Sequence, residues 1–299
     1  MNSSKDNAKS QARLYQAKRY GMGLAFMLPW IIGFCLFVAI PIGWSLFMAF
    51  NKVKVVPGGF KYEWLGGQNF RDAFLKDNVF PIELITYFQE MLLMVPIIVI
   101  FALLISLMLN QRFPGRFLYR ALFFLPVIFA TGQVLSELFV QGAGDIPFLD
   151  QYNLEPLATE YVGAEFAKTV MSVLGRVVLI LWYSGVQILI FIAGFQTISP
   201  TIYEAVRIDG ASPWDSFWKI TLPACVPFIS LNVLYTIIDL FTFPLNPVLK
   251  HIKDNMFKIE TGYGYSSALA WIYFGFVFVL IALVLWLFDR SMRTRRVRS

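Results

Sequence analysis

Six long apolar stretches dominate this chain of 299 residues. Each contains about 20 residues or more, the length that a helix needs to cross roughly 30 Å of hydrocarbon. None has the alternation of apolar and polar residues that is typical of a membrane β-strand. Charged residues make up only 15% of the chain, against about 25% in soluble domains. We therefore expect an all-α integral membrane protein with six transmembrane helices, at about 21–50, 87–109, 118–140, 170–196, 222–243 and 267–288.

Positive charges gather on one side of this six-helix arrangement. Fifteen of the 25 Lys and Arg precede the first helix, follow the last, or lie in the links after the second and fourth helices. Cytoplasmic loops are enriched in Lys and Arg, so both termini are predicted to be inside. The predicted parts are a basic cytoplasmic segment 1–20, a six-helix membrane domain 21–288 and a basic cytoplasmic tail 289–299. The tail is expected to contact anionic lipid, and no nucleic-acid partner is expected.

The chain carries no residue pattern typical of an enzyme. No glycine is followed by lysine, so the phosphate-binding loop G-x-x-x-x-G-K-[ST] is absent. The single histidine, His251, and the two cysteines, Cys35 and Cys225, do not match the ligand spacings of zinc sites. Both cysteines fall in apolar stretches and are expected to be free, buried thiols. We expect no catalytic residue, no metal site and no cofactor bound by this chain.

One segment between the fourth and fifth apolar stretches is too polar to lie inside a membrane. Residues 197–223, TISPTIYEAVRIDGASPWDSFWKITLP, contain five charges, three prolines and one glycine. A short helix is predicted to start at a Thr201–Glu204 capping box, or two residues earlier at Ser199-Pro200. It is predicted to end at Asp209 because a glycine follows.

The second half of this segment predicts an elbow and another helix. Gly210 is expected to have a positive φ, as glycine does after a helix. Ser212 as cap, Pro213 at the first helical position and Asp215 in the first turn predict a second short helix. That helix leads into the membrane helix that begins at Leu222. The segment is longer and better capped than a connection requires, which indicates a docking element.

The segment resembles the EAA loop of permease subunits of binding-protein-dependent type I ABC importers, in the carbohydrate-uptake branch. The family pattern is EAA, three residues, G, and later I-x-L-P; here valine replaces the second alanine. Glu63-Trp64-Leu65-Gly66 with Asn69-Phe70, and Gly264-Tyr265-Ser266-Ser267-Ala268, are also similar to that branch. The loop residues that carry the resemblance are Glu204, Ala205, Val206, Asp209, Gly210, Ala211, Phe217, Ile220, Leu222 and Pro223.

The resemblance implies a role for this loop as the coupling element between the membrane domain and a cytoplasmic ATPase. Glu204 would bind the ATPase, Gly210 would set the elbow, and the aromatic face of 214–218 would tie the loop to the membrane core. The implied partners are a second homologous permease, two ATPase subunits carrying ATP and Mg, and an extracytoplasmic solute-binding protein, in the cytoplasmic membrane of a prokaryote. A pair of interfacial helices resting on lipid is the alternative for the segment.

Polar residues inside the apolar stretches are candidates for a substrate pathway. Hydroxyl and amide groups beside aromatic rings suit a sugar, although membrane helices also use such groups to hold one another. Ionisable residues toward the outer ends of helices, among them Arg176 and Asp239, could instead form an ion pair. The candidate pathway residues are Trp182, Tyr183, Gln187, Asn232, Tyr235, Thr236 and Asp239.

The sequence therefore predicts a permease subunit of an ATP-driven importer for oligosaccharides or related carbohydrates, with ATP hydrolysis supplied by a separate chain. After the fifth helix, many members of the family have Gly-Gly-Pro, whereas this chain has Phe243-Pro244-Leu245-Asn246-Pro247. Another solute, such as an acidic oligosaccharide or a glycerol-phosphate, is the alternative within the same machinery. An ion-coupled secondary transporter or a membrane-embedded enzyme is the alternative outside it.

Overall fold

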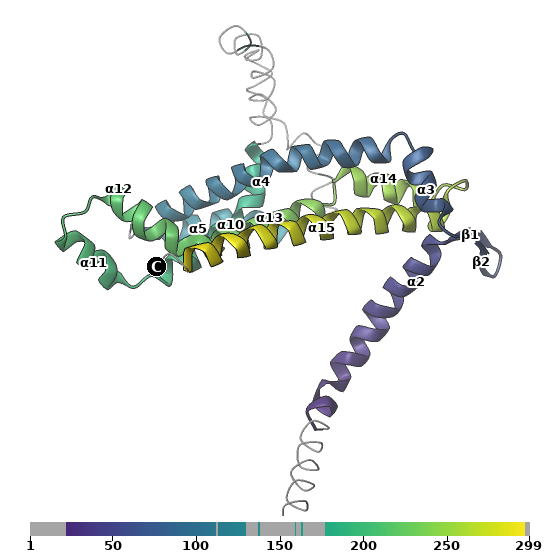
Figure 1. Cartoon of the computed structure of the whole chain (residues 1–299), viewed down its shortest axis with the longest axis horizontal. Coiled ribbons are helices and arrows are strands. Elements are labelled where there is room, and N and C mark those ends of the chain that lie inside the picture. The colour runs from purple at the N-terminus through teal and green to yellow at the C-terminus, as the bar shows by residue number, and fades with distance from the viewer. Residues whose placement is uncertain are drawn as a thin grey trace, which may run out of the picture. The chain divides into compact units, whose positions relative to one another are not determined.

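The computed structural model describes residues 22–111, 113–129, 137, 159, 163 and 177–296, and these are mostly helical (Figure 1). Four described helices are long and apolar enough to cross a membrane: Met22–Ala49, Phe80–Asn110, Pro213–Phe241 and Gly262–Arg290. Ile180–Gln196 and Pro200–Ile208, bent by 64°, make a fifth if the pair counts as one span. The predicted stretch 118–140 is described as a helix only to Phe129, and the start of the predicted stretch 170–196 lies outside the described residues.

Residues 22–76 and 254–271 form one compact unit. Its first helix passes through a π-helical turn, η1 (Cys35–Ala39), into α2 (Ile40–Ala49). A β-hairpin follows, with β1 (Asn51–Val56) antiparallel to β2 (Gly59–Trp64), and then a short helix, α3 (Gln68–Leu75). Gly58 and Gly59, with φ of 105° and 143°, allow the tight turn between these strands, which are rich in valine and aromatic residues.

The two motifs that flank this hairpin meet in space. Asn69, which is buried, donates through Nδ2 to the carbonyl oxygens of Ala49 at 2.9 Å and Asn51 at 3.1 Å. At the start of α15 (Gly262–Arg296), a Cβ atom on Gly264 would overlap the carbonyl oxygen of Asn51 and lie 3.2 Å from that of Met48. The segments at 63–70 and 264–268, singled out in the sequence, thus pack on one backbone stretch at the end of α2.

Replacement of Gly264 with alanine should lower the stability of the solubilised protein by roughly 1–3 kcal/mol, the usual effect of overpacking. The added methyl group would meet backbone oxygen atoms, which cannot rotate away as a side chain can. Gly275→Ala, in the same helix with no atom within 4 Å of its Cβ position, is the matched control. Thermal unfolding of both variants in detergent tests this, and equal stability of the two would contradict it.

The charged face of the hairpin lies outside the predicted spans. Lys54 donates to Glu63 Oε1 at 3.2 Å, and Lys61 Nζ lies 3.7 Å from the same oxygen atom. The hydrogen bond from Lys54 and its positive charge hold the pKa of the Glu63 carboxyl below its usual value. Glu63 therefore stays ionised at neutral pH and offsets the repulsion between Lys54 and Lys61, which lie directly opposite each other in the ladder.

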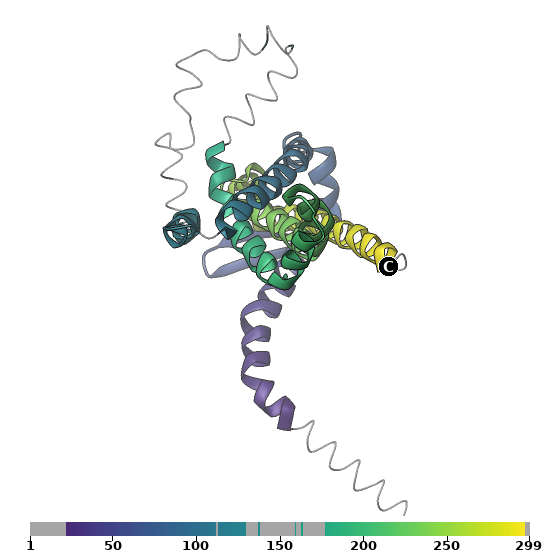
Figure 2. The ribbon, with the colours of Figure 1, turned by 90° about the vertical axis from the view of Figure 1, so that its left-hand side faces the viewer.

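Residues 77–253 and 272–296 form the second compact unit. Its core is the packing of three helices, α4 (Phe80–Asn110), α10 (Val177–Gln196) and α13 (Leu222–Phe241), which lie side by side in Figures 1 and 2. The helix α5 (Arg116–Phe129) packs on α10. Contact is close where a Cβ on Gly194 would lie 2.6 Å from the Phe228 ring, so a side chain there would push α10 and α13 apart.

The connection after α13 contains a short helix, α14 (Pro247–Met256), that the sequence did not predict. Its entry is organised by Asn246, which is fully buried: Nδ2 donates to Tyr273 Oη at 2.8 Å, and Oδ1 accepts from Val248 N at 2.9 Å. His251 Nε2 lies 2.9 Å from Asp77 Oδ2, and Asp77 also caps the N-terminus of α4. The segment 243–247, which lacks the Gly-Gly-Pro of the family, is thus an ordered turn held by hydrogen bonds of Asn246. It leads into α14, which contacts Asp77 at the start of α4 through His251.

α15 continues to Arg296, so most of the segment 289–299, predicted as a basic tail, extends the last helix; Arg290 stacks over Trp286 one turn earlier, at 5.5 Å. Two other expectations need correction. α4 begins at Phe80 and not at 87, because Asp77 supplies the cap. Cys225 is a buried free thiol as predicted, but Cys35 is exposed, since an apolar membrane helix faces lipid or other chains.

Candidate functional site

The polar segment after α10 forms two helices, as the sequence predicts. The first, α11 (Pro200–Ile208), begins with Ser199 as N-cap and Pro200 at the first helical position. The predicted capping box at Thr201 and Glu204 is wrong, and the alternative start two residues earlier is confirmed. Proline fixes φ for a first helical residue and pushes the residue before it into an extended conformation; Ser199 has ψ of 132°.

The elbow after α11 is a Schellman motif. Gly210 has φ of 76°, its N–H donates to Arg207 O at 3.1 Å, and the N–H of Ala211 donates to Val206 O at 3.2 Å. A Cβ on Gly210 would meet no atom within 4 Å. The requirement for glycine is therefore conformational, and the predicted positive φ is confirmed.

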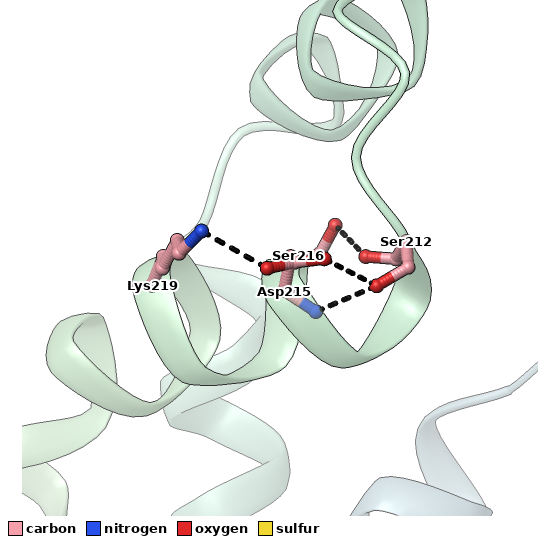
Figure 3. A network of polar contacts seen from close by, with 4 residues as sticks. All are labelled: Ser212, Asp215, Ser216 and Lys219. Atoms are coloured by element: carbon pink, nitrogen blue, oxygen red, sulfur yellow. Dashed lines mark hydrogen bonds and ion pairs between the residues drawn. The ribbon is translucent and has the colours of Figure 1, made fainter.

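The second helix starts with a compact polar network (Figure 3). It is α12 (Pro213–Ser216), and Ser212 is its N-cap: Asp215 N donates to Ser212 Oγ at 3.1 Å, and Ser212 Oγ donates in turn to the Asp215 carboxylate. Ser216 Oγ donates to Ser212 O at 3.1 Å, and Lys219 Nζ lies 2.9 Å from Asp215 Oδ1. These four side chains together hold the helix start, as expected for a capped element.

The charge of Asp215 is fixed by the same network. This turn precedes Leu222, where the apolar span of α13 begins. The Asp215 carboxylate accepts the hydrogen bond from Ser212 Oγ and pairs with Lys219 Nζ. Its carboxylate thus lies next to the positive N-terminal end of its helix.

The loop presents apolar side chains to its surroundings. Ile208 is 86% exposed at the end of α11, and Trp214 is 69% exposed on α12. Trp218 is also exposed and contacts the rings of Trp214 and Phe217, at 5.5 Å and 5.2 Å between centroids. The expectation that the aromatic face of 214–218 ties the loop to the membrane core stays a prediction, and in this chain both tryptophans are exposed. They form an exposed aromatic surface beside the elbow.

Glu204 and Asp209 are also exposed, on and just after α11, while Val206 and Ala211 are half-buried. Phe217, Ile220 and Leu222 are half-buried, and Pro223 is exposed. The loop residues that carry the family resemblance thus divide into an exposed set, which includes the charged Glu204 and Asp209, and a half-buried set, which includes Val206 and Phe217.

One contact within the loop joins two residues that the sequence did not single out. Tyr203 Oη lies 2.9 Å from Thr221 Oγ1. Tyr203 belongs to α11, and Thr221 is the last residue of a π-helical turn, η2 (Phe217–Thr221), that links α12 to α13. A tyrosine and a threonine 18 residues apart carry no sequence signal for pairing.

The candidate pathway residues on α10 and α13 form a buried polar seam. Gln187, Asn232 and Thr236 are all fully buried, and Gln187 Nε2 donates to Thr236 Oγ1 at 3.2 Å. Gln187 Oε1 and both amide atoms of Asn232 have no hydrogen-bond partner among the described residues. The buried indole N–H of Trp182 also has no hydrogen-bond partner among the described residues. Buried polar atoms without partners are costly, so this seam is not explained by packing alone.

The other candidate residues lie apart from that seam. Tyr183 is buried against the Phe243 ring at 5.1 Å and lines a cavity of about 220 Å³ with Glu90. Tyr235 and Asp239 are half-buried on α13. The cavity is smaller than the roughly 300–1,000 Å³ of typical ligand pockets. The pairing of Asp239 with Arg176 stays a prediction, because Arg176 lies outside the described residues.

In the described part of the chain, no group of three or more His, Cys, Asp or Glu could hold a metal ion.

Comparisons with known proteins place the chain among transporter subunits. No protein-family model matches it. It is 31% identical over 271 residues to a Bacillus subtilis protein named as a probable ABC transporter permease, YesP, and the match covers 84% of each chain. It is 26% identical over 229 residues to the polygalacturonan/rhamnogalacturonan transport system permease YteP of Bacillus subtilis, covering 71% of this chain and 66% of that one. Its fold matches a crystal structure of a bacterial ABC transporter involved in the import of the acidic polysaccharide alginate, with TM-score 0.60, 22% identity, and coverage of 93% and 99%.

Proposed function

This chain belongs to the family of ABC transporter permease subunits, and we propose that it forms half of the membrane pathway of a carbohydrate importer. Its partners would be a second permease, two ATPase subunits that bind ATP and Mg, and an extracytoplasmic solute-binding protein. The chain would cross the cytoplasmic membrane six times with both termini inside, so that 1–20 and 289–299 are cytoplasmic. The distribution of Lys and Arg supports this orientation.

The observation that carries the proposal is the construction of the loop between α10 and α13. It has a Schellman elbow at Gly210 and a polar cap at Ser212, so its shape is set without help from a neighbour. It also exposes Ile208 and Trp214 beside Glu204. A preformed element with exposed apolar and acidic side chains is suited to a protein cleft, because lipid surfaces favour Lys and Arg. We assign this loop as the element that docks on the ATPase.

The pathway would include the seam between α10 and α13. Gln187, Asn232 and Thr236 offer donors and acceptors that suit sugar hydroxyl groups, and three of their polar atoms have no described partner. Separation of α10 from α13 would expose these atoms to a solute. Trp182, Tyr183, Tyr235 and Asp239 would complete the pathway toward one end of the same helices.

The proposed substrate is an oligosaccharide, and acidic oligosaccharides are the favoured subclass. This assignment follows the substrates of the relative YteP, named for polygalacturonan and rhamnogalacturonan, and of the transporter of similar fold, which imports the acidic polysaccharide alginate. A glycerol-phosphate is the competing class. A screen of the cognate solute-binding protein against uronic-acid oligosaccharides, neutral oligosaccharides and glycerol-phosphates separates the three.

The assembly itself is tested by purification of the chain with its co-expressed neighbours in detergent. We expect a second permease and an ATPase to co-purify, and ATP hydrolysis in proteoliposomes to rise with the loaded binding protein. Uptake that continues without ATP and follows an imposed ion gradient would contradict the proposal and favour a secondary transporter.

A further inference from the structure

The hydrogen bond between Tyr203 and Thr221 joins the two ends of the docking loop. Tyr203 lies in α11 and is half-buried; Thr221 is 6% exposed at the point where the loop enters α13. Thr221 Oγ1 also lies 3.3 Å from Ser216 O. Thr221 Oγ1 is thus a contact point shared by Tyr203 Oη, at 2.9 Å, and Ser216 O, and either hydroxyl group can be the donor between Tyr203 and Thr221.

The π-helical turn places Thr221 where this bond can form. In η2 the N–H of Leu222 donates to Phe217 O, five residues back. One extra residue in a turn rotates the following side chains by about 100° relative to a regular α-helix. Such turns are rare and are found frequently at functional sites. The π-helical turn thus sets the rotation of α13 relative to Thr221, the residue that is hydrogen-bonded to α11.

Few other contacts hold α11 to the rest of the unit. None of its nine residues is buried. The helix is separated from α13 by the Gly210 elbow, whose backbone has the conformational freedom of glycine. Without the Tyr203–Thr221 bond, α11 could turn about that elbow while α13 stayed in place.

We infer that the Tyr203–Thr221 hydrogen bond makes α11 and α13 move as one body, so that displacement of the docking helix reaches the polar seam. The inference rests on the proposed function. α13 runs from Leu222 to Phe241, and Asn232 and Thr236 lie on it, roughly 17–23 Å beyond Thr221 at 1.5 Å per residue. Tyr203 and Thr221 are positioning residues: they act through the helix and not on the solute.

The test measures the distance between the two helices in the complete importer. Nitroxide labels are placed on Arg207→Cys in α11 and Ala224→Cys in α13, both exposed positions, in a Cys35→Ser background because Cys35 is exposed. Distances are measured by pulsed electron paramagnetic resonance, with and without ATP plus vanadate. We expect one narrow distance that is the same in both states. Tyr203→Phe and Thr221→Val should broaden it, and Thr221→Ser, which keeps the hydroxyl, should restore it.

A functional readout accompanies the distances. Tyr203→Phe and Thr221→Val should lower the import of a labelled uronic-acid trisaccharide per ATP hydrolysed by roughly threefold to tenfold, the factor of an ordinary hydrogen bond. The ATPase should still co-purify, and the double variant should be no worse than either single one. An unchanged narrow distance in Tyr203→Phe, or a distance that changes with ATP in the parent chain, would overturn the inference. If the ATPase is absent from every preparation, including the parent chain, the proposed function is contradicted. The distances between α11 and α13 would still decide the inference about Tyr203 and Thr221.

Discussion

Gly210→Val should abolish most ATP-driven uptake while leaving the chain in the membrane. The residue has φ of 76°, and a β-branched side chain is strained there by roughly 1–3 kcal/mol. No atom lies within 4 Å of the Cβ position, so the fold does not clash with valine; the elbow has to open instead. Opening breaks the bonds from Gly210 to Arg207 and from Ala211 to Val206, and would displace Glu204 from the position in which we propose that it docks.

Uptake and ATP hydrolysis in proteoliposomes measure the effect, and we expect a loss of tenfold or more in uptake. Gly210→Asn should retain most activity, because asparagine tolerates the left-handed conformation. Gly43→Val, in a helix with no atom near its Cβ position, controls for the added side chain. Wild-type uptake together with normal stimulation of ATP hydrolysis in Gly210→Val would show that this loop is not the coupling element.

The local chemistry of the docking loop could be predicted from sequence because each signal acts within a few residues. Gly210, Ser212 and Pro213 have the roles that their residue types favour. The one error, the start of α11, arose where two caps competed. The presence of proline at position 200 decides that competition, since its fixed φ suits a first helical residue and its predecessor must be extended.

The apolar stretches predicted where helices lie but not where they end. An end depends on a cap, and the cap of α4 is a side chain three residues before Phe80 that also contacts His251, far along the chain. The sequence did not predict burial either: Cys35 and Cys225 lie in similar apolar stretches, yet among the described residues Cys35 is exposed and Cys225 is buried. Composition alone does not distinguish a side chain that faces lipid from one that faces protein.

The sequence identifies the polar residues of α10 and α13 as candidates, but it does not show which of them lie together in the fold. Whether Gln187 reaches Thr236 depends on the rotation of one helix relative to the other, which is set by close contact at Gly194 and Phe228. The link from Tyr203 to Thr221 depends on a π turn, for which no residue pattern is diagnostic. Such features follow from packing across the whole unit.

Asn232→Leu should make the protein more stable and the importer less active. Asn232 is fully buried, and neither atom of its amide has a hydrogen-bond partner among the described residues. Leucine has the same branched arrangement of side-chain heavy atoms and removes two unpartnered polar atoms, so unfolding in detergent should become harder by about 1 kcal/mol or more. If the seam binds solute hydroxyl groups, uptake of a uronic-acid trisaccharide should fall tenfold or more.

Asn246→Leu is the matched control, and its stability should change in the opposite direction. That asparagine is equally buried, but its amide donates to Tyr273 Oη at 2.8 Å and accepts from Val248 N at 2.9 Å, so leucine would leave both partners unsatisfied. Thermal unfolding of the two variants side by side gives the signs. A loss of stability in Asn232→Leu as large as that in Asn246→Leu would mean that Asn232 has a structural partner. A gain in stability with normal uptake would remove the seam from the pathway. Only higher stability together with lost uptake fits a polar site kept for the solute.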